Sequence, residues 1–194
     1  MRYDRDDDFV ITGKRHDARI DYRAAVDRDG RILGVDFVQM IRCGWSMDLS
    51  LPVADRAMLH ADNAYLLPNA RITSHRLKTN TQSATAFRGF GGPQGMLGIE
   101  RVLDHVAHAV GRDPLAVRRL NYYRGAEKTG AGTGHRYGGK HSPKPEEIGP
   151  QTTPYHMPVK DFILHDMTDA LLTTSDYQAR RAAISEWNAG QSLL

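Results

Sequence analysis

The chain has 194 residues, enough for one domain or two small ones, and its hydrophobic content of 40% and charged content of 25% are typical of globular proteins. A net charge of +3 and an isoelectric point of about 9.1 permit an anionic ligand but do not demand nucleic acid. The single cysteine, Cys43, can neither close an internal disulfide nor hold an iron–sulfur cluster alone. With a charged N-terminus and no apolar run long enough for a membrane span, we expect a cytoplasmic protein that binds neither membranes nor nucleic acid.

The first third of the chain carries strand patterns. Phe9–Ile11 is a short apolar run that predicts a strand. Residues 18–26 alternate between apolar and polar side chains, and residues 32–41 form a second strand pattern. The turn residues between them end in Asp29-Gly30, which predicts a β-hairpin.

The middle of the chain combines further extended structure with helices. Residues 53–60 predict one or two helical turns, and residues 69–79 predict another extended segment. The clearest helix follows Gly91-Gly92-Pro93, where apolar residues recur at helical spacing, and Gly111 is a suitable C-terminal stop. The members of that stripe are Met96, Leu97, Ile99, Val102, Leu103, Val106, Ala107 and Val110.

The last part of the chain is predicted to be helical around a long loop. Asp113 and Pro114 suit the N-cap and first position of a short helix over 115–122. Two more helices are predicted, roughly over 159–173 and 175–187. The expected fold class is therefore α+β, with a β-hairpin-rich first half and a helical second half. Its expected segments are 1–124, a Gly- and Pro-rich surface loop or linker over 125–158, and a helical pair over 159–194.

One segment, Thr85-Ala86-Phe87-Arg88-Gly89-Phe90-Gly91-Gly92-Pro93-Gln94-Gly95, joins an extended stretch to the main helix. Its glycines allow the backbone to approach a ligand closely, and the helix N-terminus behind it favours an anion. Arg88 adds a permanent charge, and Phe90 adds a flat apolar face for a planar ring. A tight turn with Phe87 and Phe90 in the core explains the same residues, so physical reasoning alone leaves both interpretations open.

This string resembles the signature of the molybdenum-cofactor-binding large subunit of the xanthine dehydrogenase and aldehyde oxidase family, and the overall pattern is similar to the bacterial type. The resemblance covers nearly the whole chain except residues 125–151. The flanking stretches that carry it are Arg5-Asp6-Asp7-Asp8, Ile11-Thr12-Gly13-Lys14-Arg15-His16, Asp55-Arg56-Ala57, His60-Ala61-Asp62-Asn63-Ala64-Tyr65 and Leu77-Lys78-Thr79-Asn80.

The resemblance implies two groups of site residues within a segment, 1–124, that binds the molybdenum cofactor and the substrate. Arg88, Phe87 and Gly89 would contact the molybdenum–molybdopterin cofactor, while no residue of this chain would ligate a metal.

For the substrate, Phe90 would stack on a purine and Ala86 would line its pocket. Arg56 would reach the purine carbonyl and stabilise negative charge during catalysis, as xanthine-oxidising members carry Arg there and aldehyde oxidases usually do not. Without the resemblance, a surface salt bridge of Arg56 with Asp55 or Asp62 is the simpler expectation.

The implied activity is oxidative hydroxylation of hypoxanthine or xanthine to urate, with 2Fe-2S and FAD groups on a partner subunit of a hetero-oligomer. The family's other Gly-rich cofactor motif and its catalytic Glu are not found in this sequence. We therefore expect a truncated or split gene product, or an excised domain, that is inactive alone. Two alternatives stay open: an aldehyde oxidase-like specificity, and a non-enzymatic basic module that binds an anion.

Overall fold

The computed structural model describes residues 2–124, 151–160 and 162–190, which divide between two compact units, Met1–Val159 and Lys160–Leu194. Most of the loop expected over 125–158 lies outside the described residues, which resume at Gln151.

The predicted hairpin is confirmed. Strand β1 (Ala18–Val26) pairs antiparallel with β2 (Ile32–Gly44). In the turn, the Asp27 carboxylate accepts hydrogen bonds from the amides of Asp29 and Arg31 at 2.9 and 2.8 Å. Gly30 has a φ of 85°, a conformation that glycine adopts without a Cβ penalty.

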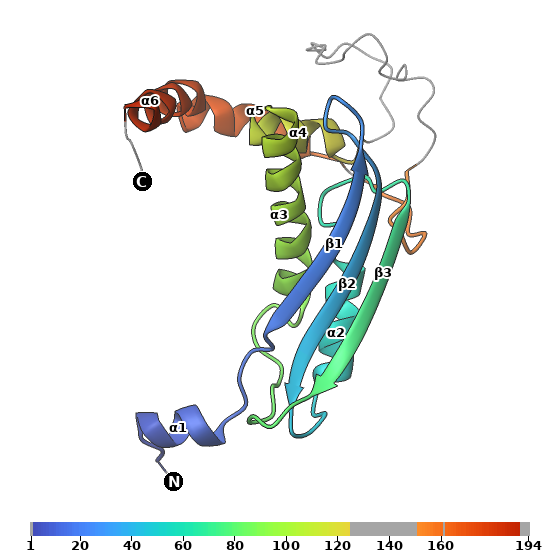
Figure 1. Cartoon of the computed structure of the whole chain (residues 1–194), viewed down its shortest axis with the longest axis vertical. Coiled ribbons are helices and arrows are strands. Elements are labelled where there is room, and N and C mark those ends of the chain that lie inside the picture. Colours follow the sequence, from blue (N-terminus) through green and yellow to red (C-terminus); the bar gives the residue numbers. More distant parts are fainter. Residues whose placement is uncertain (1, 125–150, 161, 191–194) are drawn as a thin grey trace. The chain divides into compact units, whose positions relative to one another are not determined.

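The third strand, β3 (Ala70–Lys78), pairs parallel with β2 and completes a sheet of order β1-β2-β3 (Figure 1). Parallel neighbours need a crossover connection, and here it contains helix α2 (Ser50–Leu59). The extended segment and the helical turns were predicted from the sequence, but the direction of this pairing was not.

The main helix, α3 (Gly92–Val110), runs along the sheet and ends at the left-handed Gly111, as predicted (Figure 1). Alternate residues of β2 are buried, so one face of the sheet meets the helices. Both α2 and α3 pack on that face. The buried residues of the core are Ile32, Val35, Phe37, Ala61, Tyr65, Leu67, Ile99, Val102, Leu103, Val106, Ala107 and Val117.

Helix α4 (Pro114–Asn121) starts at the predicted cap. The Asp113 carboxylate accepts from the amides of Leu115 and Ala116 at 2.9 and 3.2 Å. At its other end the buried Asn121 amide binds back to the hairpin, accepting from Ile32 N at 2.8 Å and donating to the Gly30 carbonyl at 2.9 Å. Helix α4 is therefore tied to the start of β2.

The second unit contains helices α5 (Leu164–Thr174) and α6 (Tyr177–Ala189), close to the two predicted there. Helix α5 begins at Leu164 rather than near Val159. The reason is local, because the Val159 amide donates to the Gln151 carbonyl at 2.9 Å and Thr152 forms a bridge with Pro158.

The prediction of a short strand over Phe9–Ile11 is wrong. Residues Arg5–Ile11 form helix α1, in which the Asp4 side chain accepts from the Asp7 amide at 2.9 Å. An N-cap and acidic residues in the first turn stabilise a helix start, and this outweighs the weak strand preference of three apolar residues that remain exposed. Within the described part of the chain, no helix has the length and apolar character needed to cross a membrane.

Candidate functional site

The loop between β3 and α3 folds into consecutive tight turns. The Phe90 amide donates to the Phe87 carbonyl at 2.7 Å, and the Gly92 amide donates to the Gly89 carbonyl at 3.0 Å. Gly89, Phe90 and Gly91 all have positive φ, at 93, 47 and 92°. A left-handed Phe costs about 1–2 kcal/mol, and such strain tends to gather at functional sites.

Glycines bring the N-terminus of α3 against α2. A Cβ on Gly91 would lie 2.0 Å from the Val53 carbonyl oxygen, and one on Gly95 would lie 2.1 Å from that of Ala57. Only backbones without side chains can approach this closely. The start of α3 and the loop before it therefore lie directly on α2.

Arg56 projects from α2 beside this junction. It is exposed, and its Nε would be 3.9 Å from a Cβ on Gly92, the first residue of α3. The salt bridge that the isolated sequence suggested does not form among the described residues. Asp55 pairs instead with Arg76, and Asp62 accepts from the Tyr123 hydroxyl at 2.7 Å. The Arg56 guanidinium is thus left for another partner.

Arg15 contacts both Phe87 and Arg88. The Arg15 guanidinium lies 4.3 Å from the centre of the Phe87 ring, and its Nη2 donates to the Arg88 carbonyl at 2.8 Å. Phe87 is 57% exposed and Phe90 half-buried, so the alternative that places both rings in the core does not hold. The Arg88 side chain is exposed and forms no ion pair with the described residues.

His16 forms hydrogen bonds with three parts of the site: the start of α2, the loop before α3 and the first turn of α3. Its Nε2 lies 2.7 Å from the Ser50 hydroxyl at the start of α2, and its ring hydrogen-bonds the Thr85 backbone. Its own carbonyl accepts from Gln94 Nε2, in the first turn of α3, at 3.0 Å. No role was predicted for Arg15 or His16 from the sequence. Their only signal was their place in a flanking stretch of the resemblance.

The structure therefore places Arg56 beside Gly92, directly after the loop that carries Ala86, Phe87, Arg88, Gly89 and Phe90. These residues offer two exposed guanidinium groups, a half-buried aromatic ring and a helix N-terminus, which suit a planar, anionic ligand. In the parts of the chain that the structure describes, no cluster of three His, Cys, Asp or Glu side chains could hold a metal ion. The donor set fits the organic, anionic part of a cofactor.

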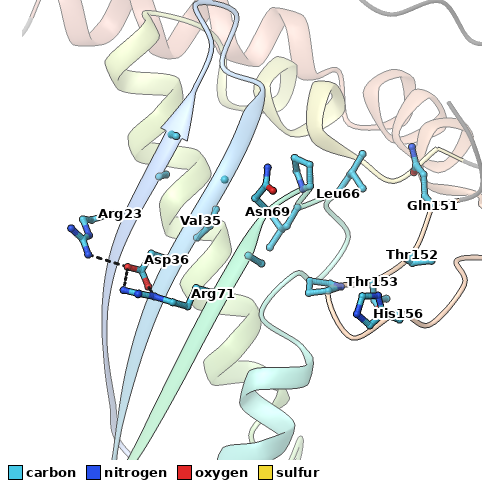
Figure 2. Close-up of a pocket in the computed structure, with 17 residues that line it drawn as sticks. Arg23, Val35, Asp36, Leu66, Asn69, Arg71, Gln151, Thr152, Thr153 and His156 are labelled. Carbon is cyan, nitrogen blue, oxygen red and sulfur yellow. Dashed lines mark hydrogen bonds and ion pairs between the residues drawn. The ribbon is translucent and has the colours of Figure 1, made fainter. Parts of the chain in front are cut away.

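The described residues also line an open pocket of about 1080 Å³ elsewhere, where β1 ends and β2 and β3 begin (Figure 2). The loop that carries Ala86, Phe87, Arg88, Gly89 and Phe90, called the motif loop, follows the opposite end of β3. In the pocket the Asp36 carboxylate pairs with both Arg23 and Arg71, at 3.1 and 2.6 Å, so it compensates only one of the two arginine charges. The pocket was not predicted, and none of the candidate site residues lines it.

The family model for the molybdopterin cofactor-binding domain matches residues 1–122. The chain belongs to this family. Among curated proteins it is similar to the xanthine dehydrogenase of Drosophila subobscura, 41% identical over 185 residues, and to the xanthine dehydrogenase/oxidase of Mus musculus, 35% identical over 185 residues. Both alignments cover 95% of this chain but only 12% of the relative.

Solved structures share the fold. The aldehyde oxidoreductase of Desulfovibrio gigas matches with a TM-score of 0.69 and 28% identity, over 92% of this chain and 17% of that one. The quinoline 2-oxidoreductase of Pseudomonas putida matches with a TM-score of 0.71 and 21% identity, over 96% of this chain and 22% of that one, which shows the fold alone. The α+β architecture expected from the resemblance, a segment of the molybdenum-cofactor-binding domain of this family, is confirmed. These two curated relatives are eukaryotic. They support the predicted likeness to xanthine dehydrogenases but not the prediction of the bacterial type.

The pH dependence of stability offers a test of the His16 contacts. Burial lowers the pKa of His16 below its ordinary 6.5, opposed by Asp48 and Asp17 and reinforced by Arg42. A lowered folded-state pKa means that the unfolded chain binds the proton more tightly, so this contribution is present above pH 6.5 and is lost as pH falls through the folded-state value.

Urea unfolding should accordingly show the wild-type chain losing stability below about pH 6.5, by up to about 1.4 kcal/mol per pH unit from this group. His16→Gln should remove that component. Equal pH slopes in the two chains would show that His16 is not buried in its neutral form.

Proposed function

We propose that this chain is a segment of the molybdenum-cofactor-binding subunit of a xanthine dehydrogenase, of the bacterial type. The observation that carries the proposal is the position of Arg56 beside the N-terminus of α3, where the Phe87–Gly91 loop ends. It is supported by membership of the cofactor-binding family and by the 41% identity to a xanthine dehydrogenase.

In this proposal the residues of the chain bind and orient, and none acts as the general base. A bound molybdenum cofactor would supply the two-electron oxidation that converts a purine C–H bond into C–OH. Phe90 would stack on the purine, and Ala86 would line the space beside it. Arg56 would stabilise the negative charge that hydroxide attack places on the heterocycle, and a comparable donor contributes about 2.7–4 kcal/mol elsewhere. Arg88, Phe87 and Gly89 would contact the anionic cofactor.

The remaining parts of the proposal concern the whole assembly. The two electrons would leave through 2Fe-2S and FAD groups on a partner subunit, in a cytoplasmic hetero-oligomer. The chain spans 12% of the length of the curated relatives it matches, so the other walls of the site would come from elsewhere. We therefore propose that the isolated chain does not turn over substrate.

An aldehyde-oxidising enzyme is the second candidate, since the Desulfovibrio gigas structure with 28% identity is named an aldehyde oxidoreductase. The Arg56 guanidinium, which forms no ion pair with the described residues, favours a purine, because an aldehyde offers no second carbonyl for it to reach.

The first test is the molybdenum content of the native chain, purified with whatever copurifies, followed by assays with xanthine, hypoxanthine and an aromatic aldehyde. Near-stoichiometric molybdenum with purine oxidation would support the proposal. Molybdenum with aldehyde oxidation alone would select the second candidate. The absence of both metal and partners would contradict a working subunit.

A further inference from the structure

Arg76 occupies an unusual position on β3. In the parallel pairing it lies opposite Ile41, whose side chain is buried in the face that meets the helices. That face would ordinarily take an apolar residue. The Arg76 side chain is only 22% exposed there, and its guanidinium forms an ion pair with Asp55 of α2. Its Nη1 also donates to the Ser74 carbonyl at 3.2 Å.

The surroundings of this ion pair are polar as well. Ser74 lies opposite the fully buried Gln39 on the same face. Three buried atoms, Gln39 Oε1, Ser74 Oγ and Arg76 Nε, have no hydrogen-bond partner among the described residues. Buried polar groups without partners lower the stability of a core. Stability therefore does not explain why Gln39, Ser74 and Arg76 lie on this face. In some proteins, polar or ionic groups are retained between packed elements because they fix one arrangement of those elements.

The element fixed here is α2. Asp55 and Arg56 are consecutive on the helix, so their side chains point about 100° apart around its axis. Asp55 reaches β3, and Arg56 lies beside Gly92 at the start of α3. Any rotation of α2 that moves Asp55 therefore moves Arg56 relative to the motif loop.

We propose that Arg76 is a positioning residue for Arg56. By holding Asp55, it sets the rotation of α2 and so the direction of the guanidinium that faces the substrate. The inference deepens the proposed function and rests on it for the role of Arg56.

The test is a double-mutant cycle in the complete enzyme, with hydrogen exchange as a second readout. Small misplacements of orienting groups are costly, so Arg76→Met should lower kcat/KM for xanthine roughly tenfold with unchanged molybdenum content. In an Arg56→Met background it should cause no further loss. Arg76→Lys, which keeps the charge, should lose less. Amides of Ser50–Leu59 should exchange faster in Arg76→Met, while those of α3 should not.

Arg71→Met is the matched control, because Arg71 lies on the same strand, is exposed and pairs with Asp36 at the other end. It should change neither kcat/KM nor the exchange of α2. Additive losses for Arg56 and Arg76 substitutions, or unchanged α2 exchange in Arg76→Met, would overturn the positioning role. If Arg56→Met itself has no effect on purine turnover while Arg76→Met still speeds the exchange of α2 amides, the proposed function fails. The role of Arg76 in holding α2 through Asp55 then stands.

Discussion

Replacing Arg56 by Met in the complete enzyme is expected to lower kcat/KM for xanthine by roughly 10²–10³-fold, the size seen when a donor to developing negative charge is removed. Most of the loss should fall on kcat, because the charge develops only in the transition state. Arg56 is exposed on α2 and forms no ion pair with the described residues, so the fold should not depend on its charge. Steady-state kinetics and a molybdenum assay check the prediction.

The matched control is Arg19→Met, since Arg19 is an exposed arginine on β1 whose ion pair, at 2.9 Å, is with Asp21 of the same strand. It should leave kcat/KM unchanged. Intact purine turnover in Arg56→Met would exclude the role assigned to Arg56. A gain of aldehyde oxidation in the same variant would agree with its part in selecting purines.

Replacing Gly91 by Ala is expected to be the most destabilising single change at the site. The new Cβ would lie 2.0 Å from the Val53 carbonyl oxygen, and the residue has a φ of 92°. Overpacking costs about 1–3 kcal/mol and the left-handed conformation about 1–2 kcal/mol, so a loss of roughly 2–5 kcal/mol is expected. Because the Val53 carbonyl belongs to the backbone of α2, the clash can be relieved only if α2 and α3 move apart. Urea denaturation measures the loss.

Gly111→Ala separates the two causes. Gly111 is also left-handed, with a φ of 65°, but nothing lies within 4 Å of a Cβ placed there. It should therefore lose only the conformational part, about 1–2 kcal/mol. Equal losses in the two variants would show that the contact between α2 and α3 is looser than the structure indicates.

Local signals determined much of the fold. The alternation over 18–26 and 32–41 with an Asp-Gly turn was enough for the hairpin, and helical spacing with Gly111 was enough for α3. These features depend on residues close in sequence, so each could be recognised without knowing its neighbours in space. Where two local signals competed, as at Phe9–Ile11, the Asp4 cap decided for a helix.

The motif residues were also identifiable from the sequence, because Arg88, Phe90 and their glycines stand in one continuous string whose resemblance is specific. The assignment of their contacts, like that of Arg56 and Ala86, stays a prediction for the experiments above. What the sequence by itself determined was therefore the local elements, the family likeness and a list of candidate residues.

Only the tertiary structure decided how those residues meet. The parallel pairing of β3 with β2 brings Arg76 to Asp55, and the glycines of α3 bring Arg56 to the motif loop. Arg15 and His16 reach the loop across more than seventy residues of sequence, as in the Arg15–Arg88 and His16–Gln94 hydrogen bonds. Contacts of this kind leave no periodicity in the chain, because they arise from the packing of separate elements rather than from the spacing of neighbours.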